Sequence, residues 1–219
     1  MYNTVIFDID GTLADSSKGI KEAVKYTINK QQLKSLSDSE LNDFIGYSPL
    51  PEAFMHYCGV DKNTASVCSD IYRKYYAENS VVLTKLYNGM IELLDCLVKN
   101  NYKLGVATYK QQKNAVLLLN ALNIGNRFSS ICGADDENLL TKEDILKNCI
   151  KELNSPACNC IFIGDSPVDG LAAKNLGCGF IAVTYGFGFK NKTDIKDCSP
   201  VFIADNTKEI KEFLCLQNV

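Results

Sequence analysis

The residues best suited to chemistry in this sequence are aspartates that follow short apolar runs. Asp8 and Asp10 come directly after the run 4–7, and Asp165 and Asp169 follow a later one. Carboxylates brought close together repel one another, so such a group must bind a cation or take up protons. Carboxylate oxygens are hard ligands that favour Mg²⁺, and magnesium held by few carboxylates typically acts on phosphate groups.

Thr108 follows a third apolar run, at residues 104–107. The carboxyl ends of the strands of a parallel α/β sheet share one edge, and ligands bind beyond that edge. We therefore expect Thr108 to lie beside the aspartates, on a strand next to the first one. A single aspartate at a strand end is as often a helix N-cap or a turn residue. That explanation does not account for aspartates at several equivalent strand ends.

The elements that must position these residues are strands alternating with helices. Six apolar runs are near-continuous, as in strands buried within a parallel sheet, and segments with helical periodicity separate the later runs. This order predicts βαβ units and an α/β fold with a doubly wound parallel sheet. The expected strands are 4–7, 104–107, 128–132, 160–163, 180–183 and 201–204, and the expected helices are 89–99, 112–122, 142–153, 169–176 and 207–216.

The first connection of this sheet is far longer than the dozen or so residues that a crossover needs. Residues 16–83 have a helical pattern throughout, with capping residues in Ser37-Asp38-Ser39 and at Asp61. We therefore predict an inserted all-helical domain at 16–83. The core domain is expected to consist of residues 1–15 and 84–219.

The composition is that of an ordinary globular protein, with 219 residues, 46% hydrophobic, 22% charged and a net charge of -3. A near-neutral chain carries no electrostatic footprint for nucleic acid or for an anionic membrane. No apolar run approaches the roughly 18 residues of a membrane span. The N-terminus has neither the basic region nor the cleavage site of a signal peptide. We expect a cytoplasmic protein with no nucleic-acid or membrane partner.

The cysteines and the single histidine exclude several other kinds of site. None of the 10 cysteines has Cys-x-x-Cys spacing, which argues against a zinc site and favours reduced thiols that act as small apolar residues. His56 is the only histidine, so any Ser-His-Asp or Cys-His nucleophile would have to depend on it. Carboxylate chemistry is therefore favoured.

The aspartates belong to a pattern that resembles a known family. Residues 8–16, Asp-Ile-Asp-Gly-Thr-Leu-Ala-Asp-Ser, resemble the first motif of the haloacid dehalogenase-like hydrolases, D-x-D-G-T-L-x-D-S, at every specified position. Thr108 is similar to the second motif, and Lys142 falls where the lysine of the third is expected. Gly164-Asp165 followed by Asp169 resembles the fourth motif, G-D-x-x-x-D. The resemblance covers essentially the whole chain.

The resemblance extends to a branch of that family. Residues 44–46, 87–89 and 184–188 are similar to segments of the phosphoglycolate phosphatase and 5′-nucleotidase-like branch. Its members have a Rossmann-like core and a helical cap between the first and second motifs. The resemblance therefore implies a phosphatase, a Mg²⁺-dependent hydrolase of a small phosphomonoester such as phosphoglycolate or a nucleoside 5′-monophosphate. It also implies a small phosphorylated metabolite as partner, and a monomer or weak homodimer.

The same resemblance assigns the reacting groups. Asp8 would be the nucleophile that forms an aspartyl-phosphate, and Asp10 would be the general acid and base. The Asp10 role requires a raised pKa, which burial under a cap could supply. The metal would be held by Asp8, the main-chain carbonyl of Asp10, and Asp165, with Asp169 as a further ligand or as support for one.

The phosphate group itself would be bound by Thr108 and Lys142, and Lys142 would also pair with the nucleophile. Lys147 is the second choice for this lysine. The sequence departs from the family pattern at Tyr109, where a small Ser or Asn is usual in Thr-x-Lys, while Lys110 is kept. We expect the tyrosine ring to narrow or reshape the leaving-group pocket.

Two other functions are compatible with the motifs. A sugar phosphomutase of the β-phosphoglucomutase type shares all four motifs and needs cap groups for a second phosphate. A non-catalytic phospho-acceptor that resembles receiver domains also uses an aspartate, a threonine and a lysine on a doubly wound sheet. The chain length and the pair Asp8 and Asp10 argue against the phospho-acceptor. The motifs do not identify the substrate.

Overall fold

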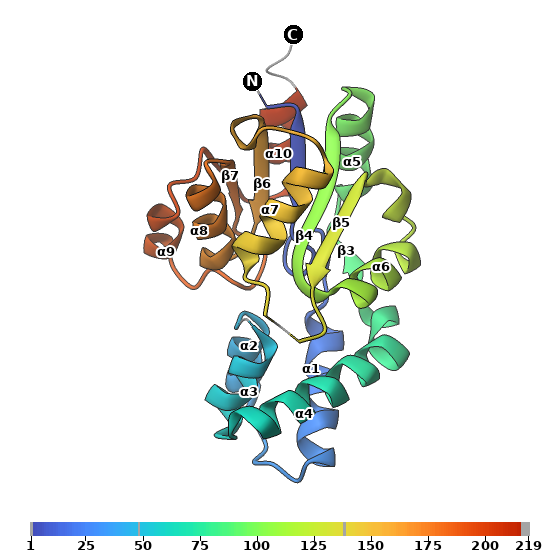
Figure 1. Ribbon diagram of the computed structural model, residues 1–219, viewed down its shortest axis with the longest axis vertical. Helices are drawn as coiled ribbons and strands as arrows, with labels where there is room; N and C mark the ends of the chain where they lie inside the picture. Colours follow the sequence, from blue (N-terminus) through green and yellow to red (C-terminus); the bar gives the residue numbers. More distant parts are fainter. Residues whose placement is uncertain (1, 48, 138, 216–219) are drawn as a thin grey trace. The chain divides into compact units, whose positions relative to one another are not determined.

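The computed structural model of the chain, which describes residues 2–47, 49–137 and 139–215, divides into two compact units (Figure 1). Met1–Asp15 with Leu86–Val219 form one, which we call the core unit, and Ser16–Lys85 form the other, which we call the helical unit.

The core unit is built on a parallel sheet, which among the described residues has six strands in the order β5-β4-β1-β6-β7-β8. β1 (Thr4–Phe7) lies between β4 (Lys103–Gln111) and β6 (Cys160–Gly164), with Thr4 in register with Lys103 on one side and Cys160 on the other. The order of the strands along the chain reverses at β1, and ligands bind at such switch points. The remaining strands are β5 (Ser130–Ala134), β7 (Gly179–Val183) and β8 (Phe202–Ala204).

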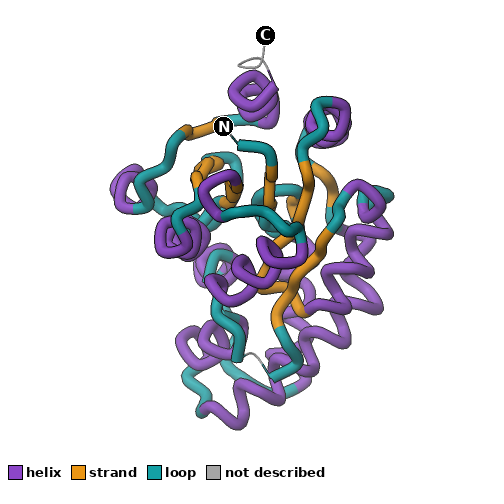
Figure 2. Tube along the Cα trace, turned by 45° about the horizontal axis from the view of Figure 1, so that its top comes forward, coloured by secondary structure: helices purple, strands orange, loops and turns teal. Residues whose placement is uncertain are grey.

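Helices cover both faces of this sheet, and the strands run through the middle of the core unit (Figure 2). On one face α7 and α8 pack Ile145, Leu146 and Ala173 against Ile6 and Phe162 of the strands. On the other face α5 and α10 pack against each other. The helices are α5 (Met90–Lys99), α6 (Gln112–Ala121), α7 (Lys142–Glu152), α8 (Pro167–Leu176), α9 (Lys192–Asp197) and α10 (Thr207–Cys215). The predicted α/β doubly wound fold is confirmed.

Element ends differ from the predictions by a few residues. The largest difference is in β4, which continues to Gln111 instead of ending at residue 107. Its register with β5 shifts between Ala107 and Gln111, so three residues of β4 face a single residue of β5, Gly133. A Cβ at Gly133 would lie 2.6 Å from the Lys110 carbonyl oxygen and 2.7 Å from the Gln112 main chain, so only glycine allows this bulge. Residue 216, the expected end of the last helix, lies outside the described residues.

The helical unit consists of α1 (Ser17–Lys30), α2 (Asp38–Ile45), α3 (Leu50–Cys58) and α4 (Lys62–Tyr75), followed by a π-helical turn and a 3-10 turn that end at Leu83. Ser37 caps α2 through a capping box with Glu40, and the Asp61 carboxylate caps α4 by accepting from the Thr64 amide at 2.8 Å. Asp61 was predicted as a capping residue, and Ser37 is one of the three residues predicted to cap the helix after 37–39. Two short strands, β2 (Ala14–Asp15) and β3 (Lys85–Leu86), form a separate sheet.

The remaining predicted features concern cysteines and membranes. The cysteines in the described part of the chain are all free thiols, and most of them are buried or half-buried, which fits the prediction that they pack as small apolar residues. His56 stacks on the Tyr47 ring with the ring centroids 5.1 Å apart. No helix in the described residues combines the length and the apolarity that crossing a membrane would take.

Candidate active site

Asp8 directly follows the carboxyl end of β1, where the order of the strands reverses. The Asp8 amide donates to the Ile163 carbonyl at 2.9 Å, which continues the β1–β6 ladder through the nucleophile candidate. The chain then turns sharply at Gly11, whose φ of 81° is unfavourable for residues with a side chain. A Cβ on Gly11 would lie 2.0 Å from an oxygen of Asp165. Glycine is therefore required here both by the backbone and by the close approach of Asp165.

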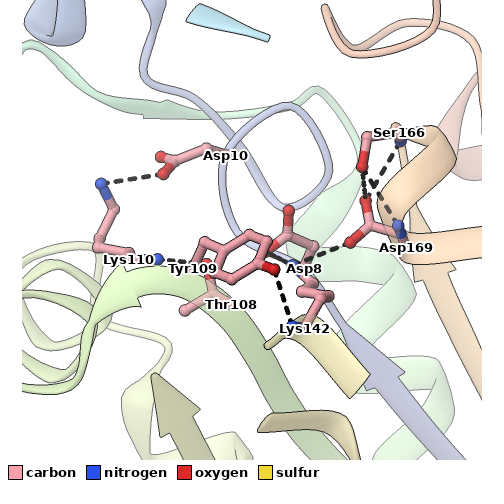
Figure 3. Close-up of polar contacts among 8 residues, drawn as sticks. All are labelled: Asp8, Asp10, Thr108, Tyr109, Lys110, Lys142, Ser166 and Asp169. Carbon is pink, nitrogen blue, oxygen red and sulfur yellow. Dashed lines mark hydrogen bonds and ion pairs between the residues drawn. The ribbon is translucent and has the colours of Figure 1, made fainter. Parts of the chain in front are cut away.

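Lys142 is the first residue of α7 and reaches back to two carboxylates (Figure 3). Its Nζ lies 2.9 Å from Asp8 Oδ1 and 2.9 Å from Asp169 Oδ1, and only 3% of the residue is exposed. Burial alone would lower the pKa of the ammonium, but the Asp169 and Asp8 carboxylates outweigh it and hold the pKa above its usual value. Lys142 is therefore charged, and Lys147 is exposed on the same helix.

Asp169 is fixed by the start of α8. It is the third residue of that helix and forms a capping box with Ser166. Its Oδ2 accepts from the Ser166 hydroxyl at 2.6 Å and from the Ser166 amide at 3.2 Å, while its Oδ1 faces Lys142. A Cβ on Gly164 would lie 2.5 Å from the Asp169 Cβ, so the glycine before Asp165 lets α8 approach β6. Asp169 thus holds Lys142 in place and caps its own helix.

Asp165 follows β6 and is enclosed by the loop after β7. Its Oδ2 accepts from the Phe187 and Gly188 amides, each at 2.9 Å. A Cβ on Gly186 would lie 2.4 Å from both the Asp165 Cβ and its Oδ2. The loop can therefore approach the carboxylate because residue 186 has no side chain. Burial, and then the neighbouring carboxylates, raise the pKa of Asp165 to about 8 despite the two amides, which lower it.

Three buried carboxylates gather here into one possible metal site. Within the described residues, Asp8, Asp165 and Asp169 each offer an oxygen, and these oxygens lie within 4.8 Å of one another. Burial also raises the pKa of Asp8 to about 6, although Lys142 acts in the opposite direction. A cation that binds among crowded carboxyl groups favours their ionised form, because it offsets the repulsion between the carboxylates. An all-oxygen set of this kind fits a hard divalent cation such as Mg²⁺.

Asp10 does not share this group, contrary to the expectation that four carboxylates meet at one point. Its Oδ2 lies 3.0 Å from Lys110 Nζ, and Figure 3 shows the pair standing apart from Asp8 and Asp169. Lys110 lies within the β4 bulge, and its ammonium reaches Asp10 on the loop after β1. The predicted role of Asp10 in metal binding concerns its main-chain carbonyl, which this pairing does not involve. Thr108 is buried at the start of the bulge, and its hydroxyl accepts from the Lys110 amide at 3.2 Å.

Several groups of the site were missed by the sequence analysis. The Phe187 and Gly188 amides hold Asp165, and the Ser166 hydroxyl holds Asp169. The Ser166 contact could have been predicted, because serine followed three residues later by an acid before a helix is the pattern of a capping box. The amides could not, because any residue has one. The hydroxyl of Tyr109 also reaches α7, where it accepts from the Lys142 amide at 2.9 Å.

Comparison with known proteins decides the family. A family model described as haloacid dehalogenase-like hydrolase matches residues 5–183, which include all of the site residues described above except Gly186, Phe187 and Gly188. The chain belongs to the haloacid dehalogenase-like hydrolases. The predicted family is therefore confirmed.

Individual relatives of this haloacid dehalogenase-like hydrolase cover nearly its whole length. It is 30% identical over 192 residues to a 5′-nucleotidase of Pseudomonas aeruginosa, with 87% of this chain and 86% of that protein covered. It is 30% identical over 208 residues to a phosphoglycolate phosphatase of Yersinia pseudotuberculosis, with 92% and 90% covered. The crystal structure of a predicted phosphatase from Clostridium acetobutylicum superposes with a TM-score of 0.90 at 34% identity, with both chains fully covered.

Proposed function

We propose that this chain is a Mg²⁺-dependent phosphatase that hydrolyses a small phosphomonoester through an aspartyl-phosphate on Asp8. The observation that carries the proposal is the ion pair of Asp8 with the buried Lys142 beside two further carboxylates. A lone aspartate at a strand end needs neither a buried lysine nor a carboxylate cluster. The names of the relatives, phosphoglycolate phosphatase and 5′-nucleotidase, support phosphatase chemistry and leave the ester open.

The first half of the proposed reaction transfers the phosphoryl group to the protein. An oxygen of Asp8 attacks phosphorus, the bond from phosphorus to the ester oxygen breaks, and Asp10 donates its proton to the leaving alkoxide. Lys142 orients Asp8 through their 2.9 Å contact and offsets charge on the transferring group. The Thr108 hydroxyl, in the adjacent bulge, binds an oxygen of the phosphoryl group.

The second half returns the protein to its starting state. Asp10, now ionised, takes a proton from water while the water oxygen attacks phosphorus, and the bond between Asp8 and phosphorus breaks. Inorganic phosphate then leaves. The structure shows Asp10 in contact with Lys110, and this contact would hold the carboxyl group in place for both proton transfers.

We assign the Mg²⁺ to Asp8, Asp165 and the main-chain carbonyl of Asp10. Bound there, the cation would supply positive charge that reduces the repulsion between the carboxylate nucleophile and the phosphate. Asp169 supports this set rather than joining it, because one of its oxygens contacts Lys142 and the other serves the α8 cap.

Phosphate release from a panel of esters tests the proposal. The panel contains phosphoglycolate, nucleoside 5′-monophosphates and sugar phosphates, each with Mg²⁺ and with a chelator. We compare the wild type with Asp8→Asn and with Asp70→Asn, which changes a 74% exposed side chain in the helical unit. Release that requires both Mg²⁺ and Asp8, and that Asp70→Asn leaves unchanged, is the expected result. Release that survives in Asp8→Asn contradicts the proposal, and absence of release from every ester favours the mutase or the phospho-acceptor.

A further inference from the structure

Tyr109 contacts both the main-chain amide and the side-chain ammonium of Lys142. Its hydroxyl accepts from the Lys142 main-chain amide at 2.9 Å, and its ring centroid lies 5.5 Å from Lys142 Nζ (Figure 3). Phe162 of β6 presents its ring to the same ammonium at 5.6 Å. Aromatic faces attract a cation through their electron density, and more strongly where water is excluded. Two rings and two carboxylates therefore surround this buried ammonium.

The hydroxyl contact lies at the start of α7, where main-chain amides have no partner within the helix. The Thr141 side chain accepts from the Asp144 amide at 3.1 Å, and the Tyr109 hydroxyl accepts from the Lys142 amide. The first of these bonds is local to the helix. The second joins the helix to β4, so it fixes where the main chain of Lys142 stands relative to the sheet.

Tyr109 lies two residues after Ala107 on β4, and both residues pack in the core on the α7 side of the sheet. The register shift with β5 begins after Ala107, and Tyr109 still lies on the face that strand alternation from Ala107 predicts. Thr108 is buried, Lys110 turns to Asp10, and Tyr109 packs on the α7 side of the sheet against the core that contains Phe162. The tyrosine therefore stands on a strand of the sheet and not on a loop.

We propose that Tyr109 is a positioning residue that fixes Lys142 Nζ between Asp8 and Asp169 through its hydroxyl and its ring. Through its contacts with the main chain and the ammonium of Lys142, its effect on the reaction passes through the lysine. The catalytic consequence rests on the proposed function, whereas the positioning of the lysine does not. One measurement tests the positioning of the lysine, and a second measurement tests the catalytic consequence.

The first measurement needs no turnover. Lysine labelled with ¹³C at Cε gives an NMR signal for Lys142, which Lys142→Arg identifies by its disappearance. Ring currents of Tyr109 and Phe162 shift the methylene protons beside the ammonium upfield. Tyr109→Phe keeps the ring and removes the hydroxyl, and Tyr102→Phe is the control, because the Tyr102 hydroxyl also bonds a main-chain group, the Leu214 carbonyl, at 2.8 Å. We expect Tyr109→Phe to reduce the upfield shift and Tyr102→Phe to leave it unchanged. A Lys142 signal that is the same in all three proteins overturns the proposal.

The second measurement is a double-mutant cycle in kcat with the best ester of the panel. We expect Tyr109→Phe to lower kcat by about 3- to 10-fold through misplacement of the lysine, with little change in Mg²⁺ affinity. In a Lys142→Met background the same change should have no further effect. Independent, multiplicative losses overturn the proposal while the phosphatase function stands. If the wild type hydrolyses no ester, the proposed function fails, and the NMR result alone decides whether Tyr109 positions Lys142.

Discussion

The buried carboxylates lead to a prediction about pH and metal binding. Without metal, the pKa of Asp165 is raised from about 3.8 to about 8, and that of Asp8 to about 6. Between the ordinary and the raised pKa the folded protein binds more protons than the unfolded chain, so the free energy of unfolding falls as pH rises through this window. Lys142, with its raised pKa, stays charged throughout and adds no slope.

The size of the effect follows from the pKa shift. Each pKa unit corresponds to about 1.4 kcal/mol, so the rise of the Asp165 pKa from 3.8 to about 8 accounts for a loss on the order of 6 kcal/mol across the window. Mg²⁺ that binds the ionised carboxylates must displace the retained protons. We therefore expect Mg²⁺ binding to release protons near pH 6.5, to release almost none near pH 9, and to stabilise the fold more strongly at the higher pH.

Calorimetry measures the protons released on Mg²⁺ binding, and urea unfolding measures how the free energy of unfolding changes with pH. Titration of Mg²⁺ in two buffers with different ionisation enthalpies counts the protons released, and urea unfolding of the metal-free protein at pH 5 to 8.5 gives the slope. Asp165→Asn should flatten that slope, and the exposed Asp70→Asn should not. A metal-free protein whose unfolding free energy rises over this range, or Mg²⁺ binding that takes up protons, refutes the reasoning.

Two further predictions use matched pairs of residues. Lys142→Met should lower kcat by about 100- to 1000-fold, the usual loss when a charge-stabilising group is removed. Lys147→Met, on the exposed face of α7, should leave kcat unchanged. Steady-state kinetics measure both variants, and equal effects would contradict the role assigned to Lys142. Gly11→Ala and Gly177→Ala both place a side chain at positive φ, but only Gly11 has a neighbour in the way, Asp165 at 2.0 Å. Both should lower the free energy of unfolding by about 1–2 kcal/mol from backbone strain, and only Gly11→Ala should also weaken Mg²⁺ binding in a calorimetric titration; equal Mg²⁺ affinities would show that the close approach does not matter.

The parts of the fold that could be predicted are those with local or periodic signals. The buried strands are marked by continuous apolar runs, and their order along the chain placed Asp8 and Asp165 at one edge of one sheet. Ser37 and Asp61 are capping residues because of their side chains and their place before a helical segment. The position of Lys142 at the start of a helix was equally visible, since Thr141 before it is a good N-cap.

The rest depended on contacts between segments far apart in the chain. The bulge in β4 arises from its register with β5 and from the space that Gly133 leaves, and neither is visible within β4 itself. Lys110 within this bulge pairs with Asp10, which stands apart from the other carboxylates. Tyr109 stood out only as a departure from the family pattern. Its bond to the Lys142 amide depends on how α7 packs on the sheet.

The central claim is that Asp8 carries the phosphoryl group, and chemical trapping tests it most directly. The protein is quenched during turnover of its best ester and treated with borohydride, which reduces an aspartyl-phosphate to homoserine. Mass spectrometry of the peptide that contains residue 8 then locates the change. We expect homoserine at position 8 in the wild type and none in the absence of substrate. Steady phosphate release with no reduction at Asp8, or with reduction at another aspartate, would contradict it.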